Sequence, residues 1–349
     1  MAQKVFKTVH DVARAAGVSV ATISRVLNQH PNVSAKTRER VLALIQQSGF
    51  RPNAIARRLA NGRTGSLCFL LSNRDIIHSF HSRVLKGVED YCQQQHRQVI
   101  FTTFDYGPDD VMPTEALPRM VREYRAIDGV LVAGTNYPNL LRYFTEVELP
   151  YVMFGNNLVT GALALPRKNA ICFDEQAGAR EAAEFLFELG HRHIAFVGDL
   201  SQPWYMRRQQ GYREAMESRG LPIATIDIRG ETDCAELGRR SVPLLLRQHP
   251  ETTAILAQDD ETACGVLENL EKLGIRVPAD MSLMGYDDIS EIRYLRPALT
   301  TVRVPKATIG WKMAEALAGI VAGKPAKPAP PLPTELVIRD SCARLTPAA

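Results

Sequence analysis

The chain begins with three short stretches in which apolar residues recur at helical spacing. The expected inward positions are Val12, Ala13 and Ala16, then Ile23, Val26 and Leu27, then Val41, Leu42 and Ile45. A hydroxyl residue precedes each stretch, and Thr8 stands in capping-box spacing with Asp11, while Ser19 and Ser34 precede the other two. Gly17 can take the positive φ that ends a helix. The pattern predicts three small helices around one core, the first two joined as a helix-turn-helix.

A fourth, shorter stretch follows, between Asn53, which can cap a helix, and Gly62, which can end one. Ile55 and Leu59 share one face, but about two turns of helix are marginal in water on their own. We expect this segment to become helical only against a partner copy or DNA. Leu59, which follows two arginines, suits insertion into a minor groove. A flexible linker is the alternative interpretation.

Beyond residue 64, short apolar runs alternate with longer stretches of helical spacing. The expected strands are 66–71, 99–104, 129–133 and 151–154, then, in a second series, 170–173, 193–197, 224–228, 254–257 and 282–285. The expected helices are 82–95, 113–125, 175–189, 205–219, 234–248 and 261–273. This alternation predicts an α/β core of two doubly wound parallel-sheet subdomains behind an all-α headpiece and hinge helix. Ligands in such folds bind beyond the carboxyl ends of the strands.

The composition is that of an ordinary globular protein. With 349 residues, 45% hydrophobic and 23% charged, the chain has room for two or three domains and is neither fibrous nor wholly disordered. No apolar run approaches the roughly 18 residues of a membrane span, and we expect no secretory signal. The six cysteines show no C-x-x-C spacing, so we expect a reducing cytoplasm and neither a disulfide framework nor a zinc site.

Charge is distributed unevenly along the chain. Residues 1–63 contain eleven Lys or Arg and only two acids, Asp11 and Glu39, whereas the remainder contains 31 basic and 36 acidic residues. A basic head on a mildly acidic body suggests that the head binds a polyanion. A solvated basic tail is the alternative on charge alone.

The outer face of the second expected helix carries the residue types that read DNA. In a helix-turn-helix this helix enters the major groove with its first residues facing the base edges. Arg25 can donate two parallel hydrogen bonds to guanine, and Val20 and Ala21 can contact a thymine methyl group. The residues suited to phosphate contacts are Thr8, Ser19, Thr22, Ser24 and Asn28. A helical bundle with an incidentally exposed arginine is the alternative.

These residues resemble the lactose-repressor (LacI/GalR) family of transcription regulators. The pattern is D-V-A-x-x-A-G-V-S-x-x-T-x-S-R-V-x-N over 11–28, V-S-x-x-T-R over 33–38 and P-N-x-x-A-R-x-L over 52–59. The resemblance implies a DNA-binding domain over 1–52 and a hinge helix and linker over 53–64. It implies that Arg25 and the residues at positions 20 and 21 read bases. It also implies that paired Leu59 side chains wedge into the centre of a pseudo-palindromic operator and bend it.

The resemblance extends through the body of the chain. The matching segments are L-G-H-R-H-I-A at 189–195, R-x-x-G-Y at 208–212, G-Y-D-D at 285–288 and L-T-T-V at 299–302. The family's core is similar to periplasmic sugar-binding proteins, whose chain crosses three times between two subdomains. This implies an effector-binding and dimerisation core over 65–349. Its first subdomain would cover about 65–165 and 303–325, and its second about 166–302 and 326–342.

Seven residues are candidates for binding a small-molecule effector, and a packing or surface role is the alternative for each. They are Phe80, His81, Asn156, Trp204, Arg208, Asp259 and Asp287. The resemblance implies that Arg208 and Asp287 grip the effector, and a guanidinium and a carboxylate suit the hydroxyls of a polyol. Trp204 precedes Arg208 by one helical turn and can stack on a sugar face. The chain departs from the family's pattern at Asp259 and around Asn156, which puts the effector's identity in doubt.

An enzyme is the main competing interpretation, because Asp259 and Asp287 could form a catalytic carboxylate pair. No nucleophile, metal-ligand set or phosphate-binding loop accompanies them, so we expect no catalytic residue and no cofactor. His191 and His193 span a helix end and a strand start, and we expect them to be structural rather than a metal site. A ligand-binding protein that acts without DNA is the third interpretation.

We therefore predict a sequence-specific DNA-binding regulator, a repressor switched by a sugar or sugar derivative bound between the subdomains. Its expected partners are double-stranded operator DNA, the effector and a second copy of the chain, with no membrane. Ten residues follow Arg339, which leaves no room for a tetramerising heptad tail, so we expect a homodimer. The expected location is the bacterial cytoplasm, with nucleoid association in the bound state.

Overall fold

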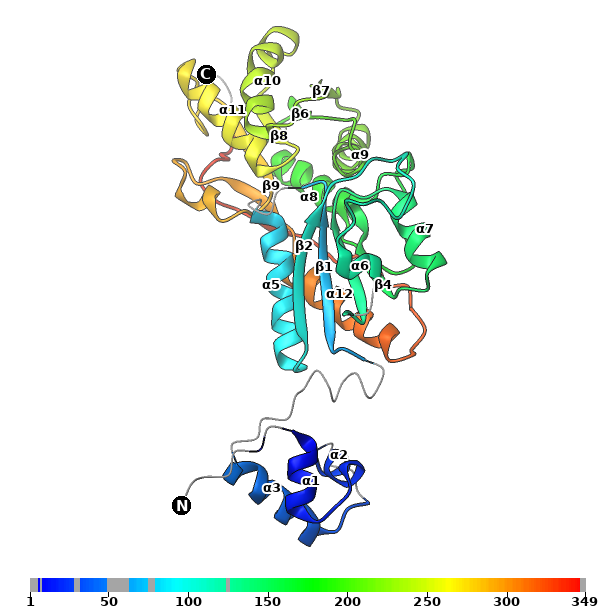
Figure 1. Ribbon diagram of the computed structural model, residues 1–349. Helices are drawn as coiled ribbons and strands as arrows, with labels where there is room; N and C mark the ends of the chain where they lie inside the picture. The colour runs from blue at the N-terminus through cyan, green and yellow to red at the C-terminus, as the bar shows by residue number, and fades with distance from the viewer. Residues whose placement is uncertain are drawn as a thin grey trace. The chain divides into compact units, whose positions relative to one another are not determined.

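The computed structural model describes residues 6, 8–27, 32–48, 63–74, 79–123 and 126–345. The chain divides into two compact units, Met1–Gly65 and Ser66–Ala349. Figure 1 shows the helical elements of the first unit in blue and the α/β elements of the second in the remaining colours. The predicted fold class is confirmed for both units. The hinge helix predicted over 53–61 lies outside the described residues.

The first unit contains three short helices, α1 (Val9–Ala16), α2 (Val20–Leu27) and α3 (Ala35–Ser48), packed around one small core. The buried core residues are Val12, Ala13, Ala16, Ile23, Val26 and Val41. The prediction that Leu42 faces this core is wrong, because its side chain is 47% exposed. Leu44, which was not predicted, and Ile45, which was, pack against the core. They follow Val41 by three and four residues and so share its helix face, whereas Leu42 is turned about 100° away.

Side-chain caps begin each of these helices as the sequence predicts. The Thr8 hydroxyl accepts a hydrogen bond from the Asp11 backbone N–H at 3.2 Å, and the Asp11 carboxylate accepts one from the Thr8 backbone N–H at 3.0 Å. The hydroxyls of Ser19 and Ser34 accept from backbone N–H groups three residues on, at 3.1 and 3.3 Å. Gly17 ends α1 with a φ of 61°, a conformation that costs most other residues energy. Local sequence therefore fixes the helix boundaries.

The second unit begins with a parallel five-stranded sheet in the order β2-β1-β3-β4-β5, and its flanking helices complete what we call the first subdomain. The strands are β1 (Ser66–Ser72), β2 (Gln98–Phe104), β3 (Gly129–Gly134), β4 (Tyr151–Phe154) and β5 (Ala170–Ile171). The helices are α5 (Ser79–Gln94), α6 (Arg119–Glu123), α7 (Pro138–Glu146) and, from later in the chain, α12 (Lys306–Val321), with a 3-10 turn η1 (Gly155–Asn157). Alternate residues of β1 face opposite cores, one under α5 and α12 and the other under α6 and α7.

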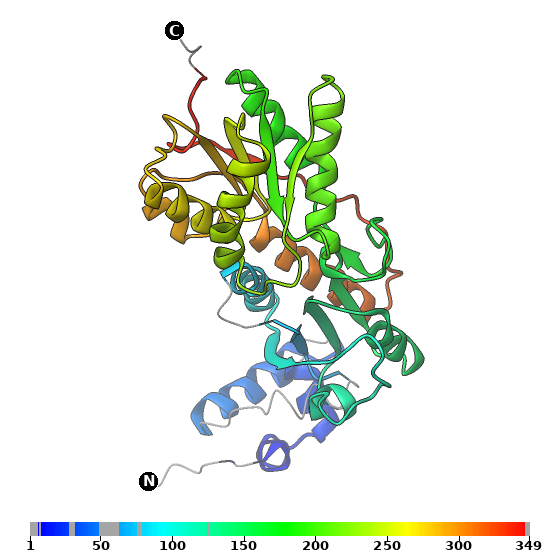
Figure 2. The same cartoon turned by 90° about the horizontal axis from the view of Figure 1, so that it is seen from above.

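The second subdomain is built on a six-stranded sheet in the order β11-β10-β9-β8-β6-β7. The strands are β6 (Ile194–Gly198), β7 (Ala224–Asp227), β8 (Ala254–Ala257), β9 (Ser282–Asp287), β10 (Thr300–Arg303) and the antiparallel β11 (Glu335–Val337). The helices are α8 (Glu175–Glu188), α9 (Pro203–Glu217), α10 (Cys234–Gln248) and α11 (Asp260–Lys272), with a 3-10 turn η2 (Glu291–Tyr294). Figure 2 shows the green helices α8 and α9 and the yellow helix α11 on opposite sides of this sheet.

Three expectations for individual elements are wrong. The strand expected to open the second series, 170–173, is β5, which pairs with β4 at the edge of the first sheet. The helix expected over 113–125 is only the five-residue α6, and the helix α7 was not expected at all. Proline at 113 and 118 interrupts helical spacing in the first case. Helix α7 begins at Pro138, and proline suits the first turn of a helix, so this proline was a start signal that the prediction did not use.

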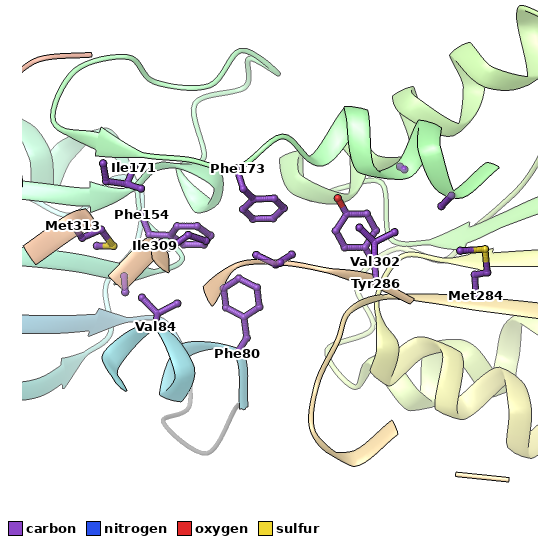
Figure 3. Packing of buried hydrophobic residues seen from close by; sticks show 14 of the residues in the cluster. Phe80, Val84, Phe154, Ile171, Phe173, Met284, Tyr286, Val302, Ile309 and Met313 are labelled. Carbon is purple, nitrogen blue, oxygen red and sulfur yellow. The ribbon is translucent and has the colours of Figure 1, made fainter. Parts of the chain in front are cut away.

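One hydrophobic core runs through both subdomains. Figure 3 shows Phe80 and Phe173 between Phe154 on one side and Tyr286 and Val302 of the second sheet on the other, and all five belong to the same cluster of buried residues. The chain passes between the sheets after β5, after β10 and after α12. Among the described residues, none of the helices is both long enough and apolar enough to cross a membrane.

Candidate ligand pocket and nucleic-acid interface

A pocket lies where the carboxyl ends of β1, β8 and β9 meet the amino-terminal ends of α5, α8 and α9. Its space is about 530 Å³, the part open to solvent included. The structure brings six of the seven predicted residues to this pocket: Phe80, His81, Trp204, Arg208, Asp259 and Asp287. Residues that the sequence analysis missed also line it, among them Arg74, Asn157, Phe173, Glu175, Tyr205 and Asp260. Both subdomains contribute residues to its lining.

Arg208 and Asp287 form a buried ion pair at the centre of the pocket. The Arg208 Nη2 donates to the Asp287 Oδ1 at 2.8 Å, and its Nη1 donates to the Gln258 carbonyl oxygen at 2.6 Å. The guanidinium carbon lies 3.9 Å from the centre of the Tyr286 ring, which holds it from one side. The Arg208 Nε is buried and has no hydrogen-bond partner among the described residues. An arginine held this way keeps one donor that no described residue satisfies.

A second buried ion pair, between Arg207 and Glu175, lies beside the first. Burial raises the pKa of Glu175, while Arg207 and Arg208 act to lower it. The Glu175 Oε1 is buried and has no hydrogen-bond partner among the described residues. The sequence held one signal for this pair. Arg207 and Arg208 are adjacent in α9, and Glu175 is the first residue of the preceding helix, α8.

The two neighbouring aspartates at the start of α11 have structural partners. The Asp259 carboxylate caps α11 by accepting from the Thr262 N–H at 2.8 Å, and it accepts from the Tyr205 hydroxyl at 2.6 Å. Asp260 accepts from the Thr301 hydroxyl at 2.6 Å and from the Ile289 N–H at 2.8 Å. Burial and the nearby Asp287 raise the pKa of Asp260. Both carboxylates therefore position the walls of the pocket as well as lining it.

Asn156 does not line the pocket, which corrects the sequence prediction. Its side-chain amide donates to the Phe173 carbonyl oxygen and accepts from the Phe173 N–H, both at 3.0 Å. The side chain is fully buried in this pairing with the segment that leads into the second subdomain. The next residue, Asn157, lines the pocket instead. Only tertiary contacts distinguish these two adjacent asparagines.

Aromatic side chains form the remaining walls. Phe80 and His81, at the start of α5, are buried with their rings edge to face at 5.3 Å. Trp204, in the first turn of α9, has its ring 5.3 Å from the guanidinium carbon of Arg74. Aromatic faces beside fixed polar groups are typical of sites that bind small, partly apolar ligands.

The predicted base-reading residues lie on the outer face of α2. Ala21, Ser24 and Arg25 are exposed, and Val20 and Thr22 are half-buried. The hydroxyls of Thr8, Ser19 and Thr22 take part in cap hydrogen bonds, and Thr8 and Ser19 are exposed. The other predicted DNA contacts lie outside the described residues: Asn28, Asn53, Ile55 and Leu59. An exposed arginine on a helix that a turn of three residues connects to α1 matches helix-turn-helix geometry.

The histidine pair has no metal-site geometry. The buried His191 ring contacts the Thr253 hydroxyl at 2.9 Å and the Ser282 hydroxyl at 3.0 Å, whereas His193 is exposed. Within the part of the chain that the structure describes, no three His, Cys, Asp or Glu side chains are grouped to hold a metal ion.

Comparison with known proteins agrees with this arrangement. Residues 8–53 match the family "bacterial regulatory proteins, lacI family", and residues 183–342 match a periplasmic binding protein-like domain. The catabolite control protein A of Priestia megaterium is 31% identical over 87% of this chain and 89% of its own length. The transcriptional regulator DegA of Bacillus subtilis is 31% identical over 97% of this chain and 98% of its own.

Solved structures give the same assignment. The lac repressor dimer bound to operator and an anti-inducer is 25% identical, with a TM-score of 0.79 over 97% of this chain and 99% of that one. The complex of the regulator CelR with cellobiose is 27% identical, with a TM-score of 0.67 over 96% and 100%. The chain belongs to the lacI family of bacterial regulatory proteins and is a DNA-binding transcriptional regulator, not an enzyme.

Proposed function

We propose that this regulator is a repressor whose operator affinity is set by an uncharged, hydroxyl-rich effector in the pocket between the subdomains. The observation that carries this proposal is the buried Arg208–Asp287 pair, with an unsatisfied donor on Arg208 and an unsatisfied acceptor on Glu175. Buried polar groups that lack partners are costly, so a ligand that supplies hydroxyl groups stabilises the closed pocket.

The charge of the pocket favours a neutral sugar over a phosphorylated one. Two basic side chains, Arg74 and Arg208, line it together with five acidic ones: Glu175, Asp259, Asp260, Glu261 and Asp287. An additional phosphate would meet this excess of carboxylates, whereas hydroxyl groups can donate to them. The cellobiose complex of CelR and the named ribose operon repressor of Haemophilus influenzae, 31% identical over 89% of this chain, support a sugar.

Successive parts of the chain have different functions in this proposal. Residues 1–52 bind DNA, 53–64 form the hinge helix and linker, and 65–349 bind the effector and pair with a second copy. In a homodimer, two copies of α2 enter successive major grooves of a pseudo-palindromic operator, each placing Arg25, Val20 and Ala21 at base edges. The operator-bound lac repressor dimer supports this arrangement. The protein acts in the cytoplasm and is associated with the nucleoid when bound.

The two sites are coupled through closure of the subdomains. Phe80 and His81 belong to the first subdomain, whereas Arg208 and Asp287 belong to the second, so one ligand holds both. Closure moves the first subdomains of a dimer relative to each other and changes the pairing of the hinge segments. A ligand shifts such an equilibrium only by its difference in affinity for the two states, and a few kcal/mol is sufficient.

Tryptophan fluorescence tests the proposal directly, because the chain has two tryptophans and one of them, Trp204, lines the pocket. In the Trp311→Phe variant, a neutral mono- or disaccharide should change the emission of Trp204 in a saturable way, and the corresponding sugar phosphates should not. The Trp204→Phe variant is the matched control, since its remaining Trp311 packs against Tyr91 away from the pocket.

Variants of the ion pair complete the test. Asp287→Ala should abolish the effector's influence on operator affinity while leaving operator affinity itself largely intact, because Asp287 is not in the DNA-binding unit. If Asp287→Ala binds the same sugar with unchanged affinity, the effector site lies elsewhere.

A further inference from the structure

A second pocket, which we call the hinge pocket, lies between the amino-terminal ends of α5 and α12 and the segment 288–305. Its space is about 840 Å³, the part open to solvent included. Four basic side chains line it, Arg83, Arg293, Arg303 and Lys306, and one acidic side chain, Asp288. Its charge is therefore opposite to that of the effector pocket.

The positive charge of the hinge pocket is only partly neutralised. Asp288 is the shared partner of Arg303 at 2.7 Å and Arg293 at 3.4 Å, and it also pairs with Arg339. Arg83 has no ion-pair partner among the described residues, and its Nη2 donates to the Ser290 hydroxyl at 3.3 Å. Three arginines share Asp288, and one of them, Arg303, also pairs with Glu335 at 2.9 Å. Together with Arg83 they still outnumber the carboxylates and form an anion-attracting surface.

Backbone groups add to this field. Helix α12 begins in the pocket wall at Lys306, and its cap residue, Pro305, provides no side-chain hydrogen bond. Ala307 and Thr308, in the first turn, are exposed. The first N–H groups of a helix lack intrahelical partners and carry partial positive charge, which favours anions. The Ser79 hydroxyl oxygen, also in the wall, is buried without a hydrogen-bond partner among the described residues.

The walls of the hinge pocket come from both subdomains. Ser79 and Arg83 are on α5 of the first subdomain, whereas Arg293 follows β9 and Arg303 ends β10 in the second. Figure 1 shows the upper end of α5 next to the orange segment that follows β9. The start of α12 is fixed against α5, since a Cβ on Gly310 would lie 1.9 Å from the Val84 carbonyl oxygen. An anion here would contact a rigid first-subdomain wall and the basic residues of the second.

We propose that the hinge pocket is a second ligand site, which binds a small phosphate-bearing anion and bridges the two subdomains through Arg83 on one side and Arg293 and Arg303 on the other. The anion stabilises one relative placement of the subdomains. By linkage, it changes the affinity of the effector pocket for its sugar by the same factor by which the sugar changes the affinity for the anion.

Calorimetric titration of the full-length protein with inorganic phosphate tests the site, at ionic strength held constant with sodium chloride. Glycerol phosphate, titrated in parallel, distinguishes a phosphorylated metabolite from the free ion by which of the two binds more tightly. Wild-type protein should bind saturably at millimolar concentration or below. Arg83→Gln and Arg293→Gln should each weaken binding about 10-fold, and Arg293→Lys should retain most of it because the charge remains.

Arg213→Gln is the matched control, because Arg213 is an exposed arginine on α9 that pairs with Glu217 outside this pocket. It removes the same charge and should bind phosphate as the wild type does. The absence of saturable binding in the wild type, or an equal loss in Arg213→Gln, would overturn the site. If Arg293→Gln loses phosphate binding and Arg83→Gln does not, the anion does not bridge the two subdomains. Binding abolished by Arg208→Gln but retained in Arg83→Gln would place the anion in the effector pocket, where Arg208 lies, and overturn the inference.

Discussion

At the scale of single residues, the role of a polar side chain depends on where its hydrogen bonds go. Asn156 and Asn157 are adjacent and chemically identical, yet the first pairs with the backbone of Phe173 and the second lines the pocket. Arg207 and Arg208 are likewise adjacent, and each is held by a different acid. Residue type therefore predicts the chemistry available at a site, and the neighbours decide which residue provides it.

Substitution of Arg25 should have a specific effect on operator recognition. It is exposed on α2, so its replacement leaves the core of the DNA-binding unit unchanged. If it reads a guanine, Arg25→Ala should cost about 1–3 kcal/mol of operator binding and relax the preference at one position in each half-site. Operator selection from a randomised library, followed by titration of the selected sites, measures both effects.

The matched control is Arg14→Ala, which removes another exposed charge, from the last turn of α1. It should weaken binding to all sequences alike and leave the selected sequence unchanged. If Arg25→Ala behaves in the same way, Arg25 contacts a phosphate and the base-reading assignment is wrong.

At the scale of elements, a buried histidine that joins segments far apart in the chain should make the stability of the fold depend on pH. His191 follows α8, and its ring contacts Thr253, Ser282 and the Ala343 carbonyl oxygen, tying together four parts of the second subdomain. Burial lowers the pKa of His191 below its ordinary value, because the charged imidazolium is poorly solvated there. The unfolded chain therefore takes up a proton at a higher pH than the folded chain does.

This difference should make the protein less stable as the pH falls below about 6.5, the pKa of an unperturbed histidine. The stability contributed by the neutral ring is fully present above that pH and decreases by at most about 1.4 kcal/mol per pH unit below it, until the folded-state pKa is reached. Urea unfolding between pH 5 and 8 measures the slope. His191→Gln should flatten it, and His193→Gln, an exposed neighbour, should not. Equal slopes in all three proteins would contradict the assignment.

The hinge segment provides a second prediction at this scale, and it rests on sequence because Leu59 lies outside the described residues. A leucine on a short helix without a core should be buried between base pairs, where unstacking costs a few kcal/mol and bending adds contacts. Leu59→Ala should reduce operator affinity and DNA bending together, with little effect on the stability of the free protein. Circular-permutation gel shifts measure the bend, and equal bends would leave Leu59 as a dimer contact only.

At the scale of the whole molecule, the uneven charge distribution determines how salt affects binding. The first 63 residues carry eleven basic and two acidic side chains, and the rest of the chain is mildly acidic. Phosphate contacts release counterions, so the logarithm of the operator association constant should fall linearly with the logarithm of salt concentration, by about 0.9 per phosphate neutralised. With about six to ten contacts per dimer, affinity should fall about 10³–10⁵-fold between 50 and 200 mM salt.

Fluorescence anisotropy of labelled operator measures this slope, and sugar binding followed by Trp204 fluorescence in the same buffers is the internal control. The sugar is uncharged in our proposal, so its affinity should hardly depend on salt. A flat salt dependence for the operator would mean that the basic head does not form the DNA interface.

The sequence by itself determined the local structure and the family. Capping residues, Gly17 and apolar spacing set the boundaries of α1, α2 and α3, because helix ends are fixed by residues within three or four positions of one another. The alternation of strands and helices predicted the two-sheet core, and fixed-spacing motifs identified the lacI family. The family pattern pointed to Arg208 and Asp287 as pocket residues, helical spacing from Arg208 pointed to Trp204, and all three line the pocket, as do the predicted residues Asp259, Phe80 and His81.

The tertiary structure decided which strands pair and which residues far apart in the chain come into contact. Strand β5 belongs to the first sheet because its pairing partner is β4, and pairing energy depends on the partner and not on the strand's own sequence. The Glu175–Arg207 pair and the hinge pocket join residues separated by tens to hundreds of positions, and such long-range contacts leave no periodic signal in one sequence. The order of the strands and the three crossings therefore create the two oppositely charged pockets from residues that sequence alone could not place together.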